Sequence, residues 1–170
     1  IVAGRDLACL HGLAAGLPAP DDIPTHYGRH VSRCRSRLKA LRTYVLVAEN
    51  RIYQTATDRV FLGLMEQVLP IAERVVRELD ASPYNGLAEA DRARGTFIYH
   101  NIGEGGMVIT HEPKPRAVFV DWSGCRLDSP VFDVAKLIGR VAKGSGGDPE
   151  VCRRTLDAYQ SVRQLSSSET

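Results

Sequence analysis

Apolar residues recur every three or four positions over two long segments of the chain, a spacing typical of helices with one buried face. The first segment begins near Arg29, and its apolar positions are Val31, Cys34, Leu38, Leu41, Val45 and Ala48. The second begins after Thr57, the expected N-cap, and contains Pro70, which should kink the helix. We expect its inward face to consist of Val60, Leu64, Val68, Ile71, Val75 and Leu79.

Shorter helices are expected towards both ends of the chain. Residues 3–15 fit a helix that ends before a proline-rich linker, LPAPDDIP. A later helix has Pro130 at its first position and Asp128 or Ser129 as its cap. Asp148 and the proline after it repeat this start signal for a last helix.

Three short runs rich in β-branched and aromatic residues predict strands: TFIYH, GMVIT and RAVFVDW. The last two are joined by HEPKPR, whose prolines and charges suit the loop of an antiparallel hairpin. Ahead of the strands, residues 80–95 mix turn-forming and charged residues without a clear period, which predicts an exposed connection that could move. Because the strands are clustered, the order predicts an α+β, mainly helical fold and excludes a doubly wound sheet.

The composition fits one globular domain of 170 residues, 44% of them hydrophobic. The 22 basic and 20 acidic residues leave a formal charge of +2, too small to indicate nucleic acid or a membrane as a partner. No window approaches the roughly 20 apolar residues that span a bilayer, and no export signal is visible, so we expect a cytoplasmic protein. The four cysteines are too far apart in sequence to suggest a zinc site or a redox motif.

The stretch FIYHNIGEGGMVIT, residues 97–110, has with Asp121 the outline of a phosphotransferase catalytic loop. Phosphoryl transfer requires an acid that positions the nucleophile, an amide oxygen and a carboxylate that hold Mg²⁺, and cations near the phosphates. Here one apolar strand ends at His100 and a later one ends at Asp121. The loop between them carries Ile102 and Met107, which offer neither a proton acceptor nor an oxygen ligand for a hard cation.

This stretch, extended to AVFVDWSGCRLDSPVFDVAKLIG, resembles the C-terminal lobe of the aminoglycoside phosphotransferase and choline kinase-like superfamily. The superfamily pattern is H-G-D-x-x-x-x-N, then a hydrophobic run with D-W/F, then D-x-P-x-x-D. Within the superfamily, the segment LACLHG makes the chain similar to spore coat proteins of the CotS type. The resemblance implies a protein-kinase-like C-terminal lobe over residues 1–165, with the N-terminal lobe absent. The polar residues 166–170 are expected to form a frayed tail.

The resemblance also implies a role for each position of the motif. His100 falls on a structural histidine that braces the loop, and Asn101 falls on the glycine that follows it. Ile102 takes the place of the catalytic aspartate, and Met107 takes the place of the asparagine that binds magnesium. Asp121 falls on the metal-binding aspartate, which makes it a vestigial metal ligand in this chain.

Some residues of the motif have two interpretations. Glu104 is either a displaced catalytic acid or a solvated turn residue. The glycines of the loop either present N–H groups to a phosphate or serve the turn alone: Gly103, Gly105 and Gly106. Asp121 either binds a metal ion or caps the local turn.

Asp128 and Asp133 are interpreted as structural residues. Asp128 is expected to cap a helix, and Asp133 to pair with an arginine such as Arg126 or Arg140. The resemblance likewise gives Asp133 a structural role. No chemistry is assigned to the scattered histidines His11, His26, His30 and His111.

We therefore expect a non-catalytic, kinase-like protein, a pseudokinase with a structural role in sporulation as a bacterial spore coat component. Its expected partners are other coat proteins or the missing N-terminal lobe, without nucleic acid or membrane, in the mother-cell cytoplasm or the coat. No cofactor is expected. The alternative is an ATP-dependent small-molecule phosphotransferase of the aminoglycoside or choline kinase-like type, in which Asp121 binds Mg²⁺. A third hypothesis is a module that binds nucleotide without turnover.

Overall fold

The computed structural model describes residues 1–18, 21–103 and 105–169. Over these residues the chain has six helices and two small antiparallel sheets, which confirms the predicted mainly helical α+β class. The chain divides into two compact units. The first unit comprises residues 1–27 and the chain from residue 85 onward; the second, the helical hairpin unit, comprises residues 28–84. None of the described helices is long and apolar enough to cross a bilayer.

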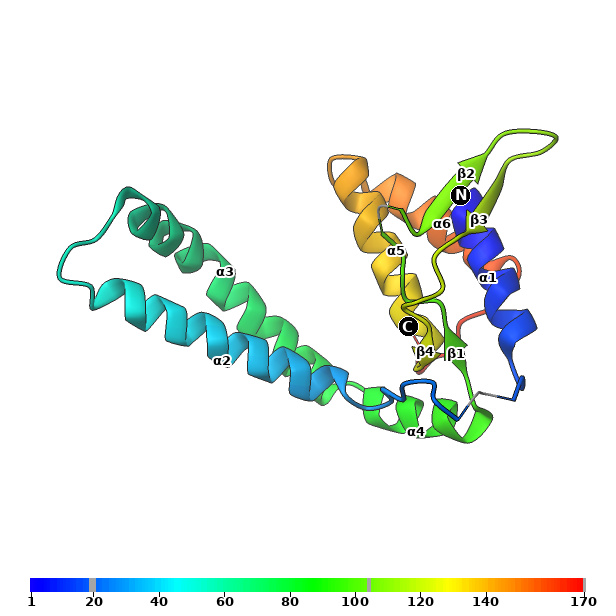
Figure 1. The fold of residues 1–170 in the computed structure, drawn as a ribbon, viewed down its shortest axis with the longest axis horizontal. Helices are drawn as coiled ribbons and strands as arrows, with labels where there is room; N and C mark the ends of the chain where they lie inside the picture. Colours follow the sequence, from blue (N-terminus) through cyan, green and yellow to red (C-terminus); the bar gives the residue numbers. More distant parts are fainter. Residues whose placement is uncertain (19–20, 104, 170) are drawn as a thin grey trace. The chain divides into compact units, whose positions relative to one another are not determined.

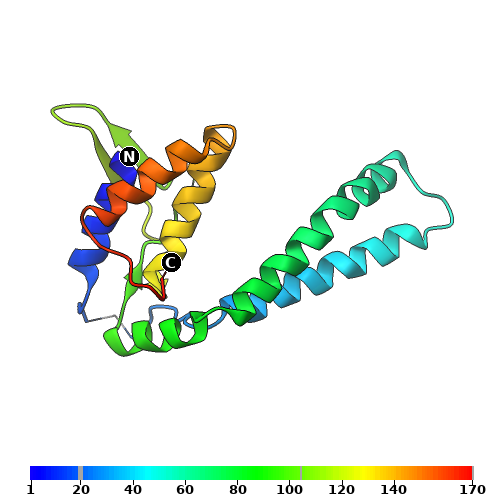
Figure 2. The same ribbon diagram turned by 180° about the vertical axis from the view of Figure 1, so that it is seen from behind.

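Three helices form the framework of the first unit: α1 (Val2–Ala14), α5 (Pro130–Gly144) and α6 (Pro149–Gln160). Both α1 and α5 pack against α6, as can be followed from behind in Figure 2. The contact between α1 and α6 is close, because a Cβ atom added to Gly4 would lie 2.4 Å from the backbone oxygen of Thr155. The buried core of this unit consists of Leu7, Ala8, Tyr99, Ile102, Val134, Leu137 and Tyr159.

The starts of the last two helices follow the predicted signals. Ser129 is the N-cap of α5, and Pro130 occupies the first turn. The side chain of Asp148 caps α6 by accepting hydrogen bonds from the N–H groups of Glu150 and Val151. A proline in the first turn costs no hydrogen bond, because that N–H would have no partner within the helix.

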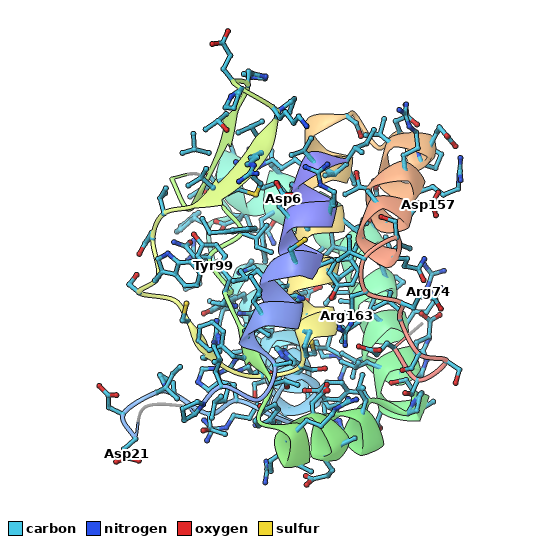
Figure 3. The ribbon with its side chains drawn as sticks, turned by 90° about the vertical axis from the view of Figure 1, so that its right-hand side faces the viewer. Asp6, Asp21, Arg74, Tyr99, Asp157 and Arg163 are labelled. Carbon is cyan, nitrogen blue, oxygen red and sulfur yellow. The ribbon has the colours of Figure 1, made fainter. Side chains whose placement is uncertain are left out.

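Two pairs of short strands carry the loop that resembles a catalytic loop. β2 (Met107–Thr110) and β3 (Arg116–Phe119) form the predicted hairpin, with Met107 opposite Phe119. β1 (Phe97–Ile98) pairs with β4 (Arg126–Leu127), a two-residue strand that the sequence did not predict. The hairpin is attached to α1, because the carboxylate of Asp6 accepts a hydrogen bond from the N–H of Ala117 at 2.7 Å (Figure 3).

The prediction of an exposed connection over residues 80–95 is wrong, since most of this segment is the helix α4 (Tyr84–Arg94). The N–H of Tyr84 donates to the hydroxyl of Ser82 at the start of the helix. Leu87, Ala88 and Asp91 are buried, and their spacing of one and three residues places them on one helical face. Burial of this face stabilises a short helix whose first turn is rich in turn-forming residues.

The helical hairpin unit consists of α2 (His30–Glu49) and α3 (Ala56–Ala81), which run antiparallel in Figure 1. The prediction for α2 is confirmed. Three of its expected inward residues are buried, Val31, Leu38 and Ala48, and the others are half-buried: Cys34, Leu41 and Val45. Two ion pairs also join the helices, Arg35 with Asp80 and Arg42 with Glu73.

The predicted inward face of α3 is wrong. The side chains of Val60, Leu64, Val68, Ile71 and Val75 are exposed, and only Leu79 of the predicted set is half-buried. The half-buried apolar residues of α3 lie on a neighbouring face and include Phe61, Leu62, Met65, Leu69 and Val76. The helix also begins two residues earlier than predicted, because Thr55 and Asp58 form a capping box.

Candidate functional site

Asp133 on α5 holds the loop that follows β1 through the backbone of the loop. Its carboxylate is fully buried and accepts hydrogen bonds from the N–H of Tyr99 at 2.8 Å and from the N–H of His100 at 3.0 Å. These bonds fix a left-handed backbone conformation at His100, whose φ is 64°. We predicted that Asp133 pairs with an arginine, and this prediction is wrong. The carboxylate is bonded to the backbone N–H groups of Tyr99 and His100 instead.

The side chain of His100 packs against α5. Its ring stacks on Phe132 with the ring centroids 5.4 Å apart and the planes inclined by 14°. The ammonium of Lys136 donates to the backbone oxygen of His100, and burial lowers the pKa of Lys136. The bracing role that the resemblance gives to His100 stays a prediction, with which this packing is compatible.

Asn101 and Asp121 form a polar pair where the loop meets the end of the hairpin. The amide nitrogen of Asn101 donates to the carboxylate of Asp121 at 2.6 Å, and the N–H of Ser123 donates to the other carboxylate oxygen at 3.0 Å. The hydrogen bonds from Ser123, followed by that from Asn101, lower the pKa of Asp121. The exposed, ionised Asp121 thus caps the turn at residues 121–123.

Ile102 and Met107 belong to the apolar packing of the first unit. The side chain of Ile102 is 5% exposed and lies in the buried core with Tyr99, Val134 and Leu137. Met107 is partly buried and packs against the same core. The position that the resemblance gives to the catalytic aspartate is therefore filled by a core residue.

The glycines of the loop are used by the loop itself. The N–H of Gly103 donates to the oxygen of Asn101 at 2.9 Å, and the N–H of Gly106 donates to the oxygen of Gly103 at 3.3 Å. A Cβ atom at Gly106 would lie 2.0 Å from the backbone oxygen of Asn101, so only glycine fits there. Gly105 has a positive φ of 83°. Two of the three N–H groups thus have partners within the loop. Glu104 lies outside the described residues.

The residues around Asp121 differ from the pattern of the superfamily, since Met107 takes the place of the magnesium-binding asparagine. Within the described part of the chain, no group of three or more His, Cys, Asp or Glu side chains is arranged to hold a metal ion. The thioether of Met107 is a poor ligand for a cation that prefers oxygen. The nearby thiol of Cys125 is not a reactive group either, since burial raises its pKa to about 11.

A buried polar network, which the sequence did not predict, connects α1, α5 and α6. The Nδ1 atom of His11 lies 2.8 Å from the hydroxyl of Tyr159, and its Nε2 atom lies 3.4 Å from the carboxylate of Asp133. Burial raises the pKa of Tyr159 to about 12. Arg163, labelled in Figure 3, bonds to Tyr159 and, at 2.6 Å, to the carboxylate of Glu169. The sequence gives little indication that His11 is buried. The only sign is its position one helical turn after the apolar Leu7.

The described tail takes part in this network. Glu169 accepts hydrogen bonds from the N–H of Ser166 at 2.9 Å and from Arg163. The side chain of Glu169 is 4% exposed. Residues 166–168 are exposed, and a frayed tail stays a prediction for them.

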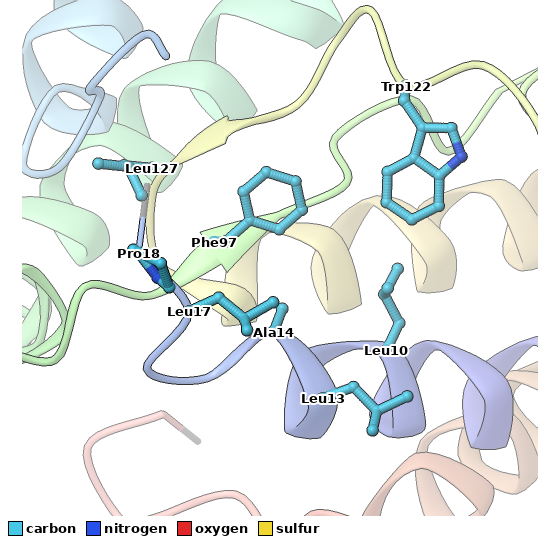
Figure 4. Close-up of a pocket in the computed structure, with 8 residues that line it drawn as sticks. All are labelled: Leu10, Leu13, Ala14, Leu17, Pro18, Phe97, Trp122 and Leu127. Atoms are coloured by element: carbon cyan, nitrogen blue, oxygen red, sulfur yellow. The ribbon is translucent and has the colours of Figure 1, made fainter. Parts of the chain in front are cut away.

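An apolar cavity of about 330 Å³ lies beside Trp122, between the C-terminal half of α1 and the β1–β4 pair (Figure 4). The only polar side-chain atom of its lining, Nε1 of Trp122, donates to the oxygen of Phe119 at 3.0 Å. The cavity therefore offers apolar contact, with no side chain that could hold a phosphate. Its lining consists of Leu10, Leu13, Ala14, Leu17, Pro18, Phe97, Trp122 and Leu127.

The fold is that of a known class of protein. The structure superposes with a TM-score of 0.83 on an aminoglycoside phosphotransferase from Alicyclobacillus acidocaldarius subsp. acidocaldarius DSM 446, at 18% sequence identity. The match covers 99% of this chain and 48% of that one, so the chain spans about half the length of the phosphotransferase. No family model and no curated protein matches the sequence. The likeness shows a kinase-like fold of the aminoglycoside phosphotransferase type.

Proposed function

We propose that the chain is a non-catalytic, kinase-like protein with a structural role. The observation that carries this proposal is the burial of Ile102 in the core of the first unit. An isoleucine cannot take a proton from an acceptor hydroxyl, and a core side chain cannot orient one. A phosphotransferase with this residue would lack the group that positions its nucleophile.

The arrangement around Asp121 supports the same function. The carboxylate is engaged by Asn101 and Ser123, and the asparagine place of the superfamily holds the thioether of Met107. ATP and Mg²⁺ are therefore not needed for the proposed role. The same polar groups instead give the loop a fixed conformation, which suits a surface recognised by other proteins.

The proposed place of action is the bacterial spore coat, reached from the mother-cell cytoplasm. This part of the proposal rests on the similarity of the segment LACLHG and of residues 97–138 to spore coat proteins of the CotS type. Residues 1–165 would correspond to a kinase-like C-terminal lobe. The proposed partners are other coat proteins or an N-terminal lobe of the kinase-like type.

Thermal unfolding with and without MgATP tests the proposal. A ligand that binds only the folded state raises its stability by RT ln(1 + [L]/Kd), about 2.7 kcal/mol at a hundredfold excess over Kd. We expect the same unfolding temperature with and without millimolar MgATP. A rise that requires both Mg²⁺ and ATP would contradict the proposal and favour the phosphotransferase or the nucleotide-binding module.

One observation favours the phosphotransferase as a second candidate. Asp121 is exposed, and its lowered pKa keeps it ionised at neutral pH, as a metal-binding carboxylate must be. If the chain is a phosphotransferase, the MgATP-dependent rise in unfolding temperature should disappear in an Asp121→Asn variant. The control is Asp157→Asn on α6, which removes another exposed carboxylate. The unfolding temperature of this variant should still rise with MgATP.

A further inference from the structure

The helix α3 has a second apolar face that does not pack against α2. We call it the α3 stripe, and its residues are Val60, Leu64, Val68, Ile71 and Val75, with exposed fractions between 38% and 64%. They are spaced by four, four, three and four residues, which confines them to a sector of about 80° on a helix with 3.6 residues per turn. The stripe is about 22 Å long at a rise of 1.5 Å per residue.

The face of α3 that packs against α2 is the neighbouring one, which carries the half-buried residues Phe61, Leu62, Met65, Leu69 and Val76. The ion pairs Arg35–Asp80 (2.5 Å) and Arg42–Glu73 (2.7 Å) lie at the edge of that face that is farther from the stripe. Around the helix axis, Asp80 and Glu73 lie roughly 160–180° from the centre of the stripe, at 3.6 residues per turn. The two helices therefore use one side of α3 and leave the stripe to solvent.

The helical hairpin unit lacks a closed core. Asp58 is the only buried residue of α3, all of whose residues the structure describes, so no apolar side chain of this 26-residue helix is buried. A helix with apolar residues on two sides requires a second layer to cover the other side. Helical hairpins find such a layer when two of them pack as a four-helix bundle.

The spacing of the stripe indicates that the second layer is another copy of the same chain. When α3 is paired with itself in antiparallel orientation about a point between Gln67 and Val68, Val60 lies opposite Val75 and Leu64 lies opposite Ile71. This is the self-complementary pattern of a two-fold interface, in which residue i contacts j and j contacts i. Four of the five stripe residues then lie opposite a stripe residue of the other copy, and Val68 lies opposite Gln67 next to the two-fold axis.

Charge disfavours the other way of pairing two hairpins. The helix α2 carries five Arg or Lys residues, six with its N-cap Arg29, and one acidic residue, Glu49. Pairing α2 with α2 would bring like charges together. The α3 stripe is uncharged and is bordered by Arg74 and Glu78, which have opposite signs. This composition, an apolar centre with a polar rim, is typical of protein interfaces.

We propose that two copies of the chain associate through the α3 stripe, with the two α3 helices antiparallel and the two hairpins forming a four-helix bundle. The proposal goes beyond the structural role proposed above and does not depend on nucleotide binding. A stripe about 22 Å long buries less than the 1,200–2,000 Å² of a standard interface, so we expect a dissociation constant on the order of micromolar.

Sedimentation of the full chain between about 1 and about 100 µM, which brackets a micromolar dissociation constant, tests the proposal. We expect a concentration-dependent shift from monomer to dimer. The variant Val75→Glu should weaken the dimer at least tenfold, because it places a carboxylate against Val60 of the other copy. The matched control is Val162→Glu in the first unit, since Val75 and Val162 are both 47% exposed. The helix content of both variants, measured by circular dichroism, should equal that of the parent chain.

The orientation of the helices is tested by cysteine cross-linking in a background with the exposed Cys9 replaced by serine. A mixture of Val60→Cys and Val75→Cys chains should form a disulfide-linked dimer on oxidation, whereas Val60→Cys chains alone should not. A cross-link between two Val60→Cys chains would overturn the antiparallel arrangement. A parent chain that stays monomeric at every concentration, or equal dissociation constants for Val75→Glu and Val162→Glu, would overturn the interface itself.

Discussion

Asp133 illustrates how the polar residues of the loop are used. Its carboxyl group accepts hydrogen bonds from the N–H groups of Tyr99 and His100 and lies 3.4 Å from His11, so one buried side chain of α5 connects α1 with the loop that follows β1. Asn101 and Asp121 hold each other and the turn at Ser123 in a similar way. A buried or engaged carboxylate of this kind stabilises a loop conformation without requiring a ligand.

The burial of Ile102 can be tested by an aspartate at that position. The Ile102→Asp variant should lose about 3 kcal/mol of unfolding free energy, because a carboxyl group in the core has no partner. The measurement is urea unfolding followed by circular dichroism. As a control, Ile52→Asp changes the same residue type where the side chain is 91% exposed, and should alter stability by less than about 0.5 kcal/mol. Equal stability of the two variants would show that Ile102 is not a core residue.

At the scale of elements, the close contact of α1 with α6 depends on one glycine. A Cβ atom at Gly4 would lie 2.4 Å from the oxygen of Thr155, whereas one at Gly12, in the same helix, would have no atom within 4 Å. Gly4→Ala should therefore cost about 2 kcal/mol by overpacking. Gly12→Ala should instead stabilise the chain by about 0.5–1 kcal/mol through helix propensity. The two unfolding temperatures should move in opposite directions, and a shift of the same sign would contradict the packing.

The capping box of α3 gives the helical hairpin unit a dependence on pH. Hydrogen bonds from the N–H and hydroxyl of Thr55, together with Arg51, lower the pKa of Asp58 below its usual 3.8. The ionised carboxylate stabilises the folded state above the unfolded-state pKa, and this contribution is lost as the pH falls through the lower folded-state pKa. The difference in unfolding temperature between the parent chain and Asp58→Asn should narrow from about pH 5 to about pH 2. A constant difference would exclude this role of Asp58.

The elements that the sequence predicted correctly are those with one apolar face or a strong start signal. The stripe of α2, the β2–β3 hairpin and the proline-led starts of α5 and α6 belong to this group. The helix α4 was not predicted because its first residues are typical of turns. Its buried face has only three side chains, too few to give a clear helical period. On α3, apolar residues cover two faces, and periodicity alone does not say which one meets α2.

The sequence predicted the position of the candidate site but not all of its hydrogen bonds. The sequence located the loop, the apolar residues Ile102 and Met107, and Asp121 at the end of the hairpin. The partners of Asp133 were not predictable, because backbone amides leave no sequence signal and His11 is far away in the chain. Contacts of this kind depend on how α1, α5 and α6 pack, which only the structure shows.

At the scale of the whole molecule, the chain has a kinase-like fold, and the proposed loss of phosphoryl transfer rests on residues within it. The structural match to an aminoglycoside phosphotransferase extends over 99% of the chain, and Ile102, which the sequence resemblance places at the catalytic acid, lies in the core. A fold is compatible with many functions, and the function depends on the site that it carries. We propose a structural role for this site and assembly through the exposed α3 stripe.

The release of phosphate from ATP in the presence of Mg²⁺ tests the central claim most directly. With Ile102 in the core and no oxygen ligand at Met107, the chain should release no more phosphate than the Asp121→Asn variant, with or without an acceptor alcohol. Mg²⁺-dependent turnover by the parent chain that is lost in Asp121→Asn and kept in Asp157→Asn would contradict the account.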